Sequence, residues 1–175
     1  MTNYESFGIS SLLLYIPYVH AQFNIKENNM WKISLSLIPF SSYLCNKYLS
    51  NTYKLADYTT IIFIVLNYLY SRRIYKWIYI IISIYSFELY NNTQFIVSRI
   101  LSYLLIYYYT LQTVDRKHCI LGIINLIISS ICFIKRNPQF PSYRIYTILW
   151  HICCTSSLYI SNVSLIINKN KLVLL

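Results

Sequence analysis

The sequence is poor in glycine and in acidic residues. Its 175 positions include 2 glycines and 5 Asp and Glu residues, and charged residues make up 11% of the chain. Soluble domains carry roughly 25% charged residues, so this chain has too little charge to cover a water-facing surface. It also has no glycine-rich phosphate loop of the kind that binds nucleotides.

Other patterns that would identify a function are missing too. The sequence contains no HExxH zinc motif and no nucleophile elbow. Its 5 cysteines form no CxxC pair and no disulfide framework, so we expect them to be small apolar packing residues. No linker, charge block or repeat divides the chain, and we predict one domain over residues 1–175.

Hydrophobic residues are abundant. They make up 57% of the chain, which includes 20 tyrosines, and the mean hydropathy is +0.45. Several apolar runs have only 14 to 17 residues, fewer than the roughly 20 of a spanning helix; interfacial tyrosines and long basic side chains extend such runs. We predict an all-α polytopic membrane protein with about seven transmembrane helices in one bundle. The expected helices are 8–22, 31–46, 57–70, 74–88, 95–111, 118–134 and 143–167. A polar hairpin over residues 46–56 is expected to join the second and third helices, and Trp31 is expected to anchor the second helix at the membrane boundary.

The basic residues predict an orientation in the membrane. Lys and Arg outnumber Asp and Glu by 15 to 5, but they lie in short clusters between the apolar runs, so we expect a lipid bilayer and no nucleic acid as partner. An N-terminus outside or in a lumen and a cytoplasmic C-terminus place the larger share of basic residues in the cytoplasm. That share comprises Lys26, Lys32, Arg72, Arg73, Lys76, Arg116, Lys117, Lys169 and Lys171.

The first expected helix, residues 8–22, has a second interpretation as a cleaved secretory signal. Signals of that kind begin with positive charge. The segment before this run contains Glu5 and neither Lys nor Arg, which favours a retained helix.

Two ionisable residues in apolar surroundings are candidates for a site. Asp57 precedes an uncharged segment that ends at Tyr70, and a lone carboxylate at the start of an apolar helix is costly in lipid unless it has a purpose. The alternative is that Asp57 caps this helix. His151 lies in the last apolar run, where a neutral, hydrogen-bonded interior histidine is the alternative to a ligand.

Three short motifs resemble the CREST superfamily, which includes alkaline ceramidases, progestin/adiponectin-type receptors and GPI-lipid remodellers. They are SSYLCN at residues 41–46, KLADY at residues 54–58 and TILWHICC at residues 147–154. The resemblance implies seven helices, with the second, third and seventh as neighbours. It also implies a zinc site for amide hydrolysis of a lipid, with Ser41 and Asp57 as catalytic residues and Cys45 and His151 as metal ligands.

The chain departs from the family pattern at two histidines. The second-helix histidine falls at Cys45 or Asn46, and the first histidine of the last-helix pair falls at Thr147. A catalytic zinc needs about three protein ligands, which Cys45, Asp57 and His151 would have to supply. We therefore predict a degenerate CREST-like protein with a lipid-binding or interaction role. A zinc-dependent lipid amide hydrolase of the same fold and a small carrier or channel subunit are the alternatives.

Overall fold

The protein is helical throughout the part of the chain that the structure describes. This computed structural model describes residues 10–26, 28–48, 50–91, 96–135 and 142–173; residues 8, 9 and 95 of the expected helices lie outside these ranges. The described residues form one short 3-10 helix and seven α-helices, and no strand, which confirms the all-α prediction. These elements are η1 (Ser10–Leu14), α2 (Tyr15–Asn24), α3 (Asn29–Tyr48), α4 (Asn51–Ser71), α5 (Tyr75–Tyr90), α6 (Ile96–Leu111), α7 (Arg116–Lys135) and α8 (Tyr143–Val173).

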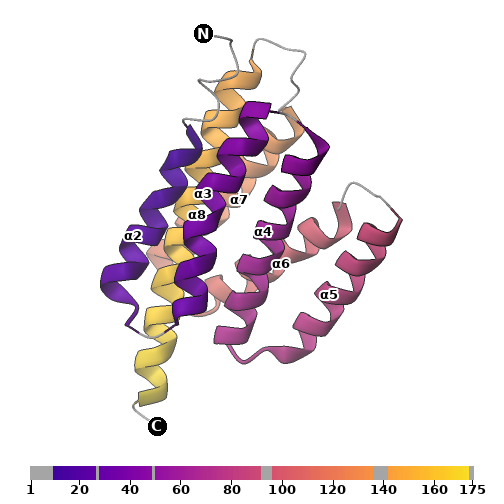
Figure 1. The fold of residues 1–175 in the computed structure, drawn as a ribbon. Coiled ribbons are helices and arrows are strands. Elements are labelled where there is room, and N and C mark those ends of the chain that lie inside the picture. The colour runs from indigo at the N-terminus through magenta and orange to yellow at the C-terminus, as the bar shows by residue number, and fades with distance from the viewer. Residues whose placement is uncertain (1–9, 27, 49, 92–95, 136–141, 174–175) are drawn as a thin grey trace.

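The helices alternate in direction along the chain (Figure 1). α3 packs along α4, and η1 and α2 pack against both α3 and α8. α7 packs mainly on α8, whereas α5 contacts α4 and α6 at the edge of the molecule. The beginning of α2 and the end of α8 therefore lie at opposite ends of the bundle.

The start of α4 differs from the sequence prediction. Residues 46–56 were expected to form a polar hairpin, but α3 continues to Tyr48 and α4 begins at Asn51. The Ser50 hydroxyl caps α4 by accepting a hydrogen bond from the Tyr53 amide at 3.3 Å, as serine commonly does. Asp57 thus lies well inside α4, and the alternative that it caps the helix is wrong.

The turn between α4 and α5 uses an arginine where many helices use glycine. Arg73 has a φ of 58°, in the left-handed region that glycine occupies at least cost. The Arg73 amide donates to the Tyr70 carbonyl and the Ile74 amide donates to the Leu69 carbonyl, both at 2.9 Å. These two bonds form a Schellman motif, which ends α4 without a glycine.

One described helix has the length and composition of a membrane span. Among the described residues, only Ile145–Ile167 within α8 is both long and apolar enough to cross a bilayer. α5 and α6 have 16 residues each, which corresponds to about 24 Å at a rise of about 1.5 Å per residue. That is less than the hydrocarbon thickness of about 30 Å, so the prediction of seven crossings stays a prediction.

Candidate functional site

His151 is the centre of a buried polar cluster between η1, α3 and α8. Only 1% of its surface is exposed. Its Nδ1 lies 2.7 Å from the Ser10 hydroxyl, and its Nε2 lies 3.3 Å from the Ser42 hydroxyl and 3.5 Å from the Asn46 side-chain nitrogen. The candidate ligand of the last helix is thus held by hydroxyl and amide groups.

The contacts of Asn46 extend this cluster. The Asn46 side-chain nitrogen donates to the Ser42 carbonyl at 2.7 Å, to the Ser42 hydroxyl at 3.3 Å and to the Ser11 hydroxyl at 3.5 Å. Each ring nitrogen of His151 thus lies within hydrogen-bonding distance of a hydroxyl group, which can donate or accept.

Ser41 and Asp57 form a second polar contact, between α3 and α4. The Ser41 hydroxyl lies 3.2 Å from the Asp57 carboxylate and 3.2 Å from the Ile38 carbonyl. Consecutive helix residues point about 100° apart, so Ser41 meets α4 while Ser42 meets η1 and α8. The structure thus places both predicted catalytic residues in contact, and it links Asp57 and His151 to α3 through neighbouring serines.

Cys45 is buried on α3, one turn beyond Ser41. Within the described residues, no three His, Cys, Asp or Glu side chains converge closely enough to hold a metal ion. The cluster therefore offers hydroxyl and amide groups around one imidazole. This chemistry suits a polar link between helices better than a zinc site.

Thr147 lies one turn before His151 on α8. Its side chain is fully buried, and its hydroxyl has no hydrogen-bond partner among the described residues. An unpaired buried hydroxyl costs free energy. Thr147 therefore differs from His151, whose ring nitrogens both have polar neighbours.

A second polar link further along α8 was missed by sequence reasoning. The buried Trp31 indole donates to the Asn162 side-chain oxygen at 2.7 Å, and the Asn162 nitrogen donates to the Pro17 carbonyl at 2.8 Å. His20 lies 3.3 Å from the same nitrogen. Asn162 thus ties α2 and α3 to α8, although Trp31 was expected at the membrane boundary; the available signal was a single asparagine in a long apolar run.

A third group joins α4, α6 and α8 around the buried Tyr68. Its hydroxyl accepts from the Thr110 hydroxyl at 2.8 Å and lies 3.1 Å from the Ser164 hydroxyl. Glu88 makes a comparable link at the edge of the bundle, where its carboxylate accepts from the backbone amides of Val97 and Ser98 at 2.8 and 3.1 Å. Polar side chains therefore hold neighbouring helices together along the length of the bundle.

Comparisons of the chain with protein families, with curated proteins and with solved structures find no match.

Proposed function

We propose that this protein is a multi-pass integral membrane protein of a degenerate CREST-like type with a lipid-binding role. The observation that carries the proposal is the distribution of polarity, with apolar side chains on the outer surface and polar links between helices within an apolar core.

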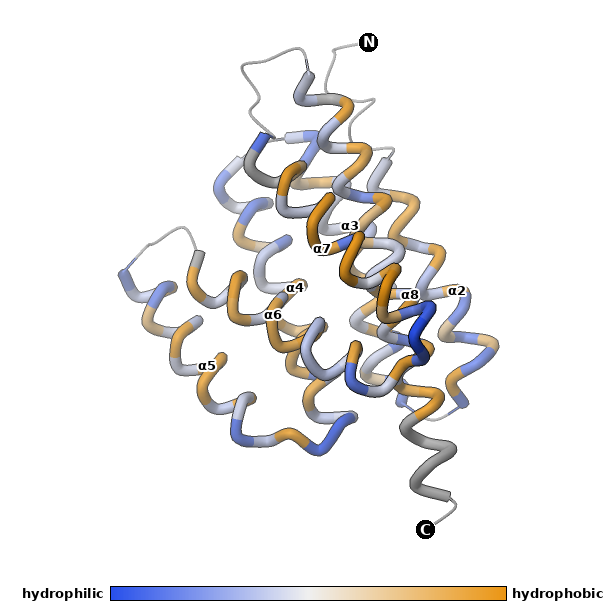
Figure 2. Tube along the Cα trace, turned by 180° about the vertical axis from the view of Figure 1, so that it is seen from behind, coloured by the Kyte–Doolittle hydropathy of each residue, from blue (hydrophilic) through white to orange (hydrophobic). Residues whose placement is uncertain are grey.

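The outer surface of the bundle is apolar along several helices. α7 exposes isoleucine and leucine along one side, and Figure 2 shows hydrophobic residues along this helix. α5 and α6 expose further isoleucine, leucine and tyrosine side chains. Soluble monomers rarely expose contiguous apolar patches of this extent. In α7 the exposed residues are Ile120, Leu121, Ile123, Ile124, Ile127, Ile128 and Ile131.

The interior combines an apolar core with buried polar groups. The buried polar groups, around His151, Asn162 and Tyr68, bond between helices. Membrane helices associate through small and polar residues, since lipid tails are as apolar as leucine and give no hydrophobic drive to burial. An apolar exterior around polar links is the arrangement expected of such a bundle.

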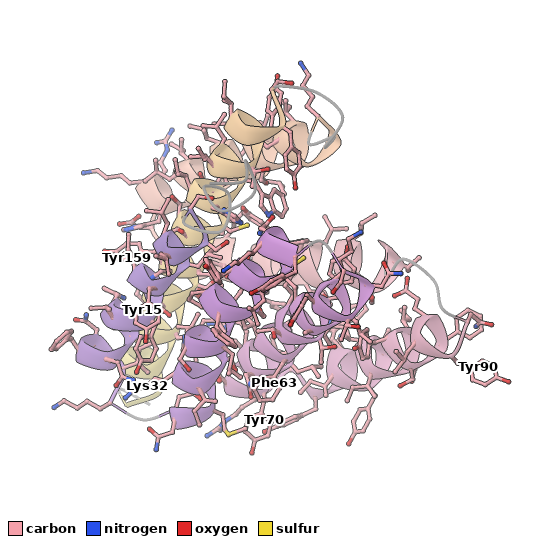
Figure 3. The ribbon with its side chains drawn as sticks, turned by 45° about the horizontal axis from the view of Figure 1, so that its top comes forward. Tyr15, Lys32, Phe63, Tyr70, Tyr90 and Tyr159 are labelled. Carbon is pink, nitrogen blue, oxygen red and sulfur yellow. The ribbon has the colours of Figure 1, made fainter. Side chains whose placement is uncertain are left out.

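Tyrosines at helix ends fit a membrane–water boundary. Tyr70 lies near the end of α4, beside the α4–α5 turn, and Tyr90 is the last residue of α5. Both lie at the edge of the molecule (Figure 3). Tyr90 is 89% exposed. Aromatic residues with a polar tip favour the headgroup level, where they extend the reach of short helices such as α5.

The Ser41–Asp57 contact and the position of His151 support the CREST-like part of the proposal. Both lie on the helices that the resemblance implies, since α4 packs along α3 and His151 joins α8 to α3. Asn46 and Thr147 stand where the family has histidines, which favours a binding protein over a zinc hydrolase. No observation among the described residues favours the hydrolase or the carrier.

Alkaline carbonate extraction of membranes from expressing cells tests the membrane proposal. We expect the protein to stay in the pellet, because seven helices with apolar exteriors are removed from lipid only by detergent. A peripheral protein carrying the same tag is the control for extraction. Release of this protein into the supernatant with that control would contradict the proposal.

A further inference from the structure

An apolar cavity lies between α3, α4, α6, α7 and α8. Its volume is about 400 Å³, within the range of roughly 300–1,000 Å³ that is usual for small-molecule sites. Isoleucine, leucine and valine form most of its wall, together with Tyr103, Tyr107 and Trp150. Trp150 precedes His151, so the cavity and the histidine cluster lie on adjacent faces of α8.

The cavity reaches the surface along α6 and α7. Ile100 and Leu104 of α6 and Ser130 of α7 belong to its wall and are themselves exposed. The surrounding outer surface of α7 is the apolar one described above. An opening at this place faces the hydrocarbon of a bilayer if the protein spans the membrane.

The polar groups of the wall are already hydrogen-bonded. The Ser129 and Ser130 hydroxyls donate to the Leu126 carbonyl at 3.0 and 2.8 Å. The Ser157 hydroxyl donates to the Cys153 carbonyl at 2.8 Å and lies 2.5 Å from the Tyr107 hydroxyl. These serines therefore leave no demand for water or a polar solute, and cavities of this kind favour apolar occupants.

We propose that this cavity binds the hydrocarbon chain of a single lipid, which enters from the bilayer between α6 and α7. The inference rests on the proposed membrane location, because only a bilayer presents hydrocarbon chains to that opening. A phospholipid acyl chain, a free fatty acid and an isoprenoid share the chemistry that the wall selects. The apolar wall gives no means of transferring ions, which separates this role from that of an ion channel.

Two neighbouring residues of α7 provide a matched test. Leu126 belongs to the cavity wall, whereas the adjacent Ile127 is exposed and does not. Leu126→Trp should fill part of the cavity, and Ile127→Trp should add the same side chain outside it. Native mass spectrometry of the protein purified in mild detergent measures the lipid that each variant retains, and the mass of the adduct identifies the lipid class.

We expect about one retained lipid per chain in the wild type and in Ile127→Trp, and at least about tenfold less in Leu126→Trp, because a steric cost above about 1.4 kcal/mol lowers affinity by that factor. Equal retention in both variants would overturn the inference. So would an adduct whose mass changes with the detergent, since the occupant would then be the detergent.

A second pair of variants tests the same inference if Leu126→Trp does not fold. Leu104→Trp alters the α6 wall, and Tyr108→Trp, one turn further on an exposed position outside the wall, is its control. Far-ultraviolet circular dichroism selects the folded variants. If the protein resists carbonate extraction but both Leu126→Trp and Leu104→Trp retain the lipid, only the cavity inference is contradicted. If carbonate releases the protein, the membrane proposal is contradicted as well.

Discussion

At the scale of single residues, the bundle is held by polar side chains in apolar helices. His151 shows the pattern most fully, because its two ring nitrogens connect α8 to η1 and to α3. Removal of one partner of a buried hydrogen bond leaves the others unpaired, which costs more than the bond itself contributes. Substitutions of buried polar residues should therefore change the free energy of unfolding by different amounts, according to how many hydrogen-bond partners each residue has.

His151→Ala tests a well-paired residue. The substitution removes a fully buried ring and leaves Ser10, Ser42 and Asn46 with one partner fewer. We expect the free energy of unfolding in detergent to fall by about 2–4 kcal/mol, the range for a large-to-small core change combined with a lost polar contact. Chemical denaturation followed by circular dichroism measures this difference.

Thr147→Val is the matched contrast, one helical turn away on α8. Valine keeps the shape of threonine and removes the hydroxyl that has no partner among the described residues. We expect the free energy of unfolding to stay unchanged or to rise by about 1 kcal/mol. Destabilisation of Thr147→Val as large as that of His151→Ala would show that the hydroxyl has a partner in the folded protein.

At the scale of elements, helix ends are fixed by side chains rather than by glycine. Ser50 caps α4, Glu88 accepts from the first amides of α6, and Asp115 caps α7. The Asp115 carboxylate accepts from the His118 amide at 2.9 Å and lies 2.7 Å from the His118 ring. The backbone hydrogen bond from His118 holds the pKa of Asp115 below its usual value, and the His118 side chain lowers this pKa further.

The Asp115 cap should make the start of α7 sensitive to acid. A carboxyl group whose pKa is lowered by folding stabilises the folded state above its unfolded pKa of about 3.9. That contribution is lost as the pH falls through the lower, folded pKa. We expect hydrogen-exchange protection of the His118 and Cys119 amides to fall in this acidic window and to be constant above about pH 5.

Asp115→Asn supplies the control for acid sensitivity. Asparagine keeps an oxygen that accepts the His118 amide but does not titrate. The variant should lose the acid-dependent change in protection at the two amides. An identical pH dependence in both proteins would place the responsible group elsewhere.

At the scale of the whole molecule, the described α-helices alternate in direction, and α2 begins at the end of the bundle opposite to the one where α8 finishes (Figure 1). The α2–α3, α4–α5 and α6–α7 turns lie toward one end, with Lys26, Arg72, Arg73, Arg116 and Lys117 in or beside them. Positive residues favour the cytoplasmic side of a membrane. This end, where α8 also finishes, is the expected cytoplasmic end.

Tags at the two termini test this topology in intact cells. We expect an N-terminal tag to be accessible from outside, or from the lumen of an internal membrane, and a C-terminal tag to be accessible only after permeabilisation. Exchanged accessibilities would reverse the orientation. Tags on the same side would show an even number of crossings, and α2, which has 10 residues, would then be the helix to re-examine as one that does not cross.

Several features followed from the sequence because they depend on neighbouring residues. The all-α class follows from apolar runs separated by polar segments, and the contact between Ser41 and Asp57 was anticipated from motifs on consecutive helices. The start of α4 was placed wrongly because the polar segment 46–56 was interpreted as a hairpin. That segment lacks glycine and proline, and Ser50 supplies a cap, so it forms helix despite its polarity.

The sequence by itself determined the helical class, the approximate helix positions and the asymmetry of charge, since these depend on local composition and spacing. Only the tertiary structure decided which polar residues meet: Ser10 and Ser42 at His151, Asn162 at Trp31, and Thr110 and Ser164 at Tyr68. The tertiary structure alone also decided the cavity, because five helices form its wall. Contacts between residues that are distant in the sequence depend on how helices rotate and pack against one another, and that rotation is set by all of the helix surfaces together.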